Sequence, residues 1–84
     1  MYILQSKKTL SYYVGYSRDV QRRLAEHNRG KVASTKPRAP YEVVYTEPFA
    51  DEVEARQRER FIKRQKSRKY VEQLVRHALV AQLD

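Results

Sequence analysis

Two side chains able to bind an anion or to move a proton occupy positions that the sequence pattern assigns to apolar residues. Residues 18–29 have helical spacing, and the positions that share one face at i, i+3, i+4 and i+7 are Val20, Arg23, Leu24 and His27. The opposite face is an ordinary solvated set of Arg22, Glu26 and Arg29. A half-buried arginine is costly unless it meets an anion. Either Arg23 and His27 belong to a functional site, or Arg23 pairs with a structural acid and His27 is a capped residue at the helix edge.

A glutamate presents the same anomaly with the opposite charge. Glu59 falls on the apolar stripe of Ala55 and Ile62, although residues 56–69 hold eight cations and no other acid. Its carboxylate needs a counterion, and the candidate ion-pair partners are Arg23, Arg56, Arg58 and Lys63. A carboxylate is also the ligand that a hard cation prefers. A lone carboxylate suits one Mg²⁺ or Mn²⁺ that keeps several waters and is completed by a phosphate, and it fits a two-metal site poorly.

An aromatic hairpin is expected at the start of the chain. "YILQ" at residues 2–5 and "LSYYVGY" at residues 10–16 are strand-forming runs separated by a polar turn. Side chains alternate across a strand, so Tyr13 and Gly15 share a face, and a register that pairs even with odd residues adds Tyr2 to it. Gly15 would then leave space beside two phenols. Taken singly, each tyrosine is equally explained as amphipathic core, and Gly15 as a bulge or a site of close helix packing.

The remaining elements follow from turn residues and periodicity. They are a basic loop at 30–40, a strand at 41–47, a helix from Asp51 to about Arg64, a hinge at 66–69 and a helix at 70–83. The last helix carries an apolar face that closes the core or makes an oligomer contact rather than a membrane anchor. That face consists of Val71, Leu74, Val75 and Ala78. The order ββαβαα predicts an α+β fold in a single domain, residues 1–84, with a three-stranded antiparallel sheet flanked by three helices.

The charge balance favours a polyanionic partner. The chain has 18 Lys and Arg against 10 Asp and Glu, a net charge of +8 on 84 residues. Such a potential favours nucleic acid first and an anionic membrane surface second. The absence of cysteine excludes disulfides and thiolate metal sites, and "MYILQSKK" lacks the apolar run of a signal peptide or membrane span. A cytoplasmic protein without a membrane partner is therefore expected.

Five ordered segments carry a family resemblance. They are "YIL", "YYVGYS", "RRLAEHNRGK", "STKPRAPYEVVY" and "EARQRERFIK". Together, over roughly residues 1–75, they resemble the GIY-YIG nuclease family, and in particular its small stand-alone members related to the catalytic domain of the nucleotide-excision-repair incision subunit. The positions that fall on the family's motif residues are Tyr2, Tyr13, Val14, Gly15, Arg23, His27 and Glu59.

The resemblance implies metal-assisted hydrolysis of DNA phosphodiester bonds with low sequence specificity, in DNA repair or recombination. In family terms, Tyr2 or Tyr13 acts as general base or relays the proton, and His27 assists. Arg23 faces the scissile phosphate, and Glu59 holds one Mg²⁺ or Mn²⁺. A nearby cation and Arg23 are expected to lower the pKa of the phenol. The predicted contacts to the DNA backbone are Lys36, Arg38, Lys63, Arg64 and Lys66.

Two departures from the family pattern support an alternative. Many relatives have an asparagine after the glutamate, whereas the only asparagine here is Asn28, in the first predicted helix. One residue precedes Tyr2, so the first strand is expected to be poorly anchored and its tyrosine mobile. The alternative is a catalytically weak or inactive nucleic-acid-binding module on the same scaffold, and a third hypothesis is a basic adaptor for a protein partner. The sequence leaves a protein partner or a homodimer open.

Overall fold

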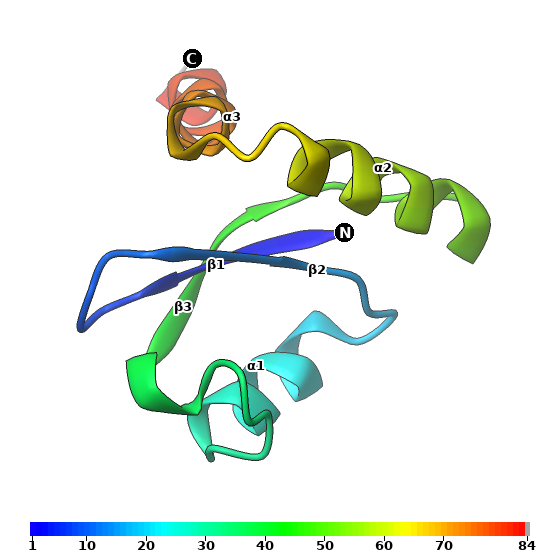
Figure 1. Cartoon of the computed structure of the whole chain (residues 1–84). Helices are drawn as coiled ribbons and strands as arrows, with labels where there is room; N and C mark the ends of the chain where they lie inside the picture. The colour runs from blue at the N-terminus through cyan, green and yellow to red at the C-terminus, as the bar shows by residue number, and fades with distance from the viewer. Residues whose placement is uncertain (84) are drawn as a thin grey trace.

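A three-stranded antiparallel sheet lies between helices on its two faces (Figure 1). The computed structural model describes residues 1–83. The strands are β1 (Tyr2–Ser6), β2 (Tyr12–Gly15) and β3 (Tyr41–Thr46), in the order β2-β1-β3. The helices are α1 (Val20–Asn28), α2 (Glu52–Arg64) and α3 (Arg68–Leu83), with a short 3-10 helix η1 (Lys36–Arg38) before β3. The predicted α+β class and the order ββαβαα are therefore confirmed.

The hairpin register puts the predicted residues on one face. Tyr2 lies opposite Gly15 and Leu4 lies opposite Tyr13, so even residues of β1 pair with odd residues of β2. Residues opposite each other in an antiparallel pair project to the same side. Tyr2, Tyr13 and Gly15 consequently share the sheet face that α1 covers.

Several boundaries differ from the predicted ones: α1 is shorter than the predicted 18–29, and β3 ends at Thr46 rather than at residue 47. Strand β2 starts at Tyr12 because Leu10, with φ of 64°, belongs to the turn. The loop at 30–40 contains η1. Helix α3 starts at Arg68 rather than at residue 70, since the hydroxyl of Ser67 accepts a hydrogen bond from the Tyr70 N–H at 3.2 Å and caps the new helix.

Each face of the sheet has its own apolar core. On the side of α2 and α3, the buried residues are Met1, Ile3, Val14, Ile62 and Val71. On the side of α1, the buried residues are Tyr2, Leu4 and Tyr41, against which Val20 and Leu24 of α1 pack. The last helix thus closes the core, as its apolar face predicts. In the part of the chain that the structure describes, no helix is both long and apolar enough to cross a membrane.

Strand β1 is firmly anchored at its first residue. The backbone nitrogen of Met1 donates to the Glu47 carbonyl at 3.0 Å, and the Glu47 N–H donates to the Met1 carbonyl at 2.9 Å. The Met1 side chain is itself buried in a core. The expectation of a poorly anchored first strand is therefore wrong, because Glu47, the residue after β3, holds Met1 through two backbone hydrogen bonds.

Candidate active site

One pocket of about 380 Å³ brings together residues from β1, β2, α1 and α2. Its lining residues are Tyr2, Tyr13, Gly15, Tyr16, Arg23, Arg56, Glu59 and Arg60. Five of them are site residues predicted from the sequence: both tyrosines of the two motifs, the glycine, the helix arginine and the glutamate. His27, the sixth, lies behind Tyr2 and is completely buried.

Gly15 is required by space rather than by backbone conformation. A Cβ at this position would stand 2.6 Å from the hydroxyl of Tyr2 and 2.7 Å from the carbon that bears it. Real Cβ atoms do not approach other atoms so closely. The Tyr2 ring therefore occupies the volume that any other residue at position 15 would fill, which explains why the two face each other across the hairpin.

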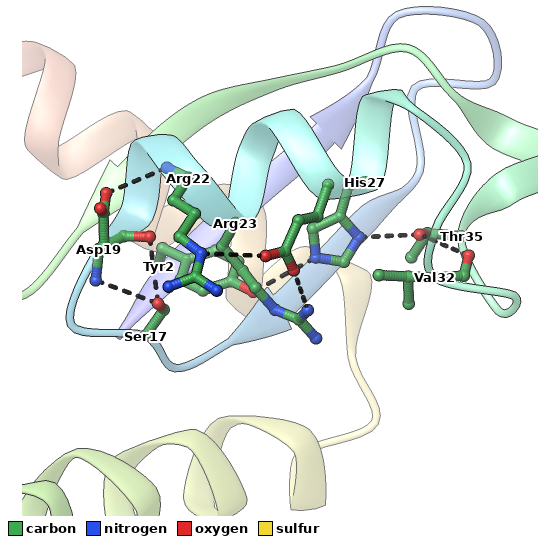
Figure 2. Close-up of polar contacts among 9 residues, drawn as sticks. Tyr2, Ser17, Asp19, Arg22, Arg23, His27, Val32 and Thr35 are labelled. Atoms are coloured by element: carbon green, nitrogen blue, oxygen red, sulfur yellow. Dashed lines mark hydrogen bonds and ion pairs between the residues drawn. The ribbon is translucent and has the colours of Figure 1, made fainter.

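A chain of hydrogen bonds leads from the pocket into the interior (Figure 2). The hydroxyl of Tyr2 lies 3.3 Å from Nε2 of His27, and Nδ1 of His27 lies 2.8 Å from the hydroxyl of Thr35. The Thr35 hydroxyl in turn donates to the Val32 carbonyl at 3.3 Å. Three tyrosine rings surround the imidazole, with centroids 4.8 to 6.3 Å away, from Tyr2, Tyr13 and Tyr41. The interpretation of His27 as a capped residue at the helix edge is thus wrong.

The electrostatics of Tyr2 and His27 favour their neutral forms. Burial lowers the pKa of His27 from 6.5, and the positive charge of Arg23 lowers it further against the opposing effect of Glu26. Burial also raises the pKa of Tyr2 to about 12, with a contribution from Tyr13. Arg23 does lower the pKa of Tyr2, as expected, but burial outweighs it. For Tyr2, Arg23 alone therefore does not produce the lowered phenol pKa that was expected from Arg23 together with a nearby cation.

Arg23 is held by an acid from its own helix. Its Nη1 lies 2.6 Å from Oε2 of Glu26, and Glu26 also accepts from Nε of Arg22 at 3.3 Å (Figure 2). Glu26 is therefore half-buried between two guanidinium groups, not a member of an ordinary solvated face. Since 37% of the Arg23 side chain is exposed and it lines the pocket, it keeps access to an anion there.

Glu59 faces the pocket with a lysine as its counterion. Nζ of Lys63, one of four candidate partners, lies 2.6 Å from Oε1 of Glu59 and 5.9 Å from the centre of the Tyr13 ring. The Glu59 side chain is 20% exposed. Among residues 1–83, no three histidine or acidic side chains gather as a metal cage. A magnesium ion that keeps its waters requires only one or two carboxylates, so Glu59 beside the phenols fits such an ion.

Two pocket arginines were not among the predicted site residues. Arg56 and Arg60 lie four residues apart on α2 and flank Glu59 in the lining. Arg56 also pairs with Glu52 at 2.6 Å. The spacing of Arg56, three residues before Glu59, was an available signal, but it could not be distinguished within a run of eight cations. With Arg23, they give the pocket three guanidinium groups against one carboxylate, so the lining favours anions.

The predicted DNA-contacting residues lie outside the pocket lining. Lys36 and Arg38 are exposed on η1, at the end of the loop that carries Thr35. Lys63, Arg64 and Lys66 are exposed at and just after the end of α2. Asn28 does not reach the pocket lining either. Its amide oxygen accepts from the Tyr41 N–H at 2.7 Å and its amide nitrogen donates to the Tyr41 carbonyl at 3.2 Å, which ties α1 to β3.

Comparison with known proteins points to one family. The sequence model described as "GIY-YIG catalytic domain" matches residues 1–71. A UPF0213 protein of Streptococcus pneumoniae serotype 4 is 45% identical over 67 residues, which are 79% of this chain and 67% of that protein. UPF0213 protein YazA of Bacillus subtilis is 38% identical over 76 residues, 86% of this chain and 76% of that protein. A UPF0213 protein of Staphylococcus haemolyticus is 43% identical over 77 residues, which are 87% of this chain and 93% of that protein. No solved structure matches.

Proposed function

The chain belongs to the family of GIY-YIG catalytic domains, which are nuclease domains, and we propose that it is a metal-dependent endonuclease. Its substrate in this proposal is DNA, cut with low sequence specificity in repair or recombination. One observation carries the proposal: a single pocket is lined by Tyr2, Arg23 and Glu59, and its phenol is hydrogen-bonded to a buried histidine that is neutral at neutral pH.

Tyr2 serves as a proton relay between the pocket and His27. With a pKa of about 12, the phenol keeps its proton at neutral pH. A water that attacks a phosphate in the pocket can give a proton to the Tyr2 oxygen while Tyr2 passes its own proton to Nε2 of His27, 3.3 Å away. Because no free phenolate has to accumulate, the raised pKa of Tyr2 is compatible with this role. Tyr13, on the same wall of the pocket, is the alternative proton acceptor.

The charged residues bind and neutralise the phosphate. A guanidinium binds phosphate oxygens through paired hydrogen bonds, so Arg23 is assigned to the scissile phosphate. Glu59 would hold one Mg²⁺ or Mn²⁺, and such an ion, when bound, supplies Lewis acidity toward the phosphate and the attacking water. Outside the pocket, the assigned contacts to the DNA backbone are Lys36, Arg38, Lys63, Arg64 and Lys66, whose effect is sequence-independent and salt-sensitive.

Nicking of supercoiled plasmid tests this function. The pure protein is expected to nick the plasmid with Mg²⁺ or Mn²⁺ and to stop when the metal is chelated. Glu59→Gln and Tyr2→Phe are expected to lower the rate by about 100-fold or more. Glu54→Gln is the matched control, because Glu54 is an exposed acid in the first turn of the same helix. That control should keep the wild-type rate.

Two outcomes would contradict the proposal. One is the absence of nicking at every salt concentration with either metal. The other is nicking that persists in both Glu59→Gln and Tyr2→Phe, which would point to a contaminating nuclease. Salt-sensitive DNA binding that is equal in wild type and Glu59→Gln, without nicking, would instead support a non-catalytic binding module on the same scaffold.

A further inference from the structure

We propose that Thr35 is a positioning residue that keeps a proton on Nδ1 of His27 and thereby leaves Nε2 as a bare acceptor for the Tyr2 hydroxyl. The consequence for turnover rests on the proposed nuclease function, whereas the protonation state of His27 is a property of the folded chain alone. The two ring nitrogens of histidine are not equivalent, and the hydrogen bond made by one decides what the other can do. In this site, the hydrogen bond at Thr35 and the hydrogen bond at Tyr2 both assign the ring hydrogen to Nδ1 of His27.

The first line of argument starts at Thr35. A threonine hydroxyl has one hydrogen to donate. The structure aligns it with the carbonyl of Val32 at 3.3 Å, and a carbonyl can only accept. With its hydrogen directed to Val32, the Thr35 oxygen is an acceptor toward Nδ1 of His27, 2.8 Å away (Figure 2), and this arrangement assigns the ring hydrogen to Nδ1.

The second line of argument starts at Tyr2 and does not involve Thr35. The phenol has one hydrogen, and Tyr2 as a whole residue is 1% exposed. Arg23, which acts on the same hydroxyl, can only donate. In the described part of the chain, the acceptor within hydrogen-bonding distance of the Tyr2 hydroxyl is Nε2 of His27. If Nε2 carried a hydrogen, the phenol oxygen would have to accept it, and the phenol hydrogen would be left without an acceptor among the described residues, which buried polar groups avoid.

Burial makes Thr35 hard to replace. His27 is 0% exposed and Thr35 is 3% exposed, so solvent has little access to either end of their hydrogen bond. The position of Thr35 is set by the turn in front of η1, where the Thr35 and Lys36 N–H groups both donate to the Val32 carbonyl, at 3.2 and 3.0 Å. This turn directs Thr35 inward while the next residue, Lys36, is exposed.

The protonation state of His27 can be measured without any activity. Long-range ¹⁵N–¹H correlation spectra of the folded protein at pH 7.5 distinguish the two neutral forms of histidine. The chain has two histidines, and His77→Gln assigns the signals because His77 is exposed. We expect His27 to carry its hydrogen on Nδ1. A hydrogen on Nε2 would overturn the proposal whether or not the protein cuts DNA.

Substitution then tests whether Thr35 is the cause. Thr35→Val removes the acceptor at nearly constant volume, and Thr35→Ser keeps it. We expect Thr35→Val to shift the His27 hydrogen toward Nε2 and to lower kcat for nicking about 10- to 100-fold, with KM within about twofold, since partners that orient a functional histidine have effects of this size. Thr35→Ser should keep the wild-type spectrum and rate. Thr46→Val, in an exposed threonine of β3, controls for the loss of a hydroxyl elsewhere.

The possible results separate this inference from the proposed function. A folded Thr35→Val protein with the hydrogen still on Nδ1 and an unchanged kcat overturns the inference while nicking itself stands. Conversely, a wild-type protein that does not nick contradicts the proposed function, and the spectra still decide the role of Thr35. If Thr35→Val does not fold, the wild-type spectrum and Thr35→Ser decide: a hydrogen on Nε2 in the wild type, or a changed state in Thr35→Ser, overturns it.

Discussion

The Tyr2 ring fills the volume in which a side chain at position 15 would lie. The Tyr2 hydroxyl stands 2.6 Å from where a Cβ of residue 15 would be placed, and the same hydroxyl contacts Nε2 of His27. The glycine in the second motif is thus tied to the tyrosine in the first by direct packing. The two motifs lie on consecutive strands of one hairpin and specify one contact.

Gly15→Ala should consequently damage both stability and activity. The added methyl group forces the buried Tyr2 ring aside, and overpacking of this kind costs about 1–3 kcal/mol in the free energy of unfolding. Urea denaturation measures that loss, and nicking should fall in parallel because the hydrogen bond to His27 is strained. In a Tyr2→Leu background, whose shorter side chain vacates the space, the same substitution should cost little. An equal cost in both backgrounds would show that the close contact is not the cause.

Acidification should destabilise the protein through His27. Because burial and Arg23 lower the pKa of His27 below 6.5 in the folded chain, the unfolded chain binds a proton there that the folded chain does not. The contribution of neutral His27 to the free energy of unfolding is therefore fully present above pH 6.5 and is lost progressively as the pH falls below that value. It stops changing below the pKa that His27 has in the folded chain. For one proton, the free energy of unfolding changes by at most about 1.4 kcal/mol per pH unit.

Urea denaturation between pH 5 and 7.5 measures this slope. His27→Gln should flatten it, and His77→Gln, at an exposed position, is the control for the loss of an imidazole. Glu26 does not interfere, because Arg23 lowers the pKa of its carboxyl below 4.5, outside this pH range. Identical slopes in wild type and His27→Gln would refute the assignment of the effect to His27.

Lys63 should compete with a divalent cation for Glu59. Its ammonium lies 2.6 Å from Oε1 of Glu59, so a metal ion at this carboxylate meets a resident positive charge. Half of the Lys63 side chain is exposed, and exposed pairs contribute little, so Lys63→Gln should raise the affinity for Mn²⁺ only about two- to fivefold. Calorimetric titration of the protein with Mn²⁺, without DNA, measures this. Arg64→Gln removes one positive charge from the next residue and should raise the affinity for Mn²⁺ less. Equal increases in affinity for the two variants would show that the net charge of the protein, and not the ion pair with Glu59, is the cause.

The polar residues on apolar stripes could be predicted because helical and strand periodicity fix the direction of a side chain before any packing is known. Arg23, His27 and Glu59 stood out for that reason, and the hairpin alternation put Tyr2, Tyr13 and Gly15 on one face. Their partners could not be predicted in this way. Which of four cations pairs with Glu59 depends on side-chain reach.

Other features depend on packing that has no periodic signal. Thr35 lies in a loop next to Ser34, and nothing local indicates which of the two hydroxyls turns inward; the turn at Val32 decides it. The direction of the Tyr2 pKa likewise depends on the competition between burial and Arg23, and the sequence alone shows only the arginine. The boundary of α3 moved because a single serine, Ser67, caps the helix earlier than its apolar pattern begins.

Consecutive residues of β1 enter different cores. Tyr2 packs in the core on the side of α1, which also holds His27 and Arg23, and Ile3 packs in the core that contains Ile62 of α2, the helix of Glu59. The proton-handling half and the carboxylate half of the pocket are thus supported by separate sets of apolar contacts, joined through one peptide unit. A substitution in the core around Ile62 is therefore expected to shift Glu59 on α2 while leaving the contact between Tyr2 and His27 in place.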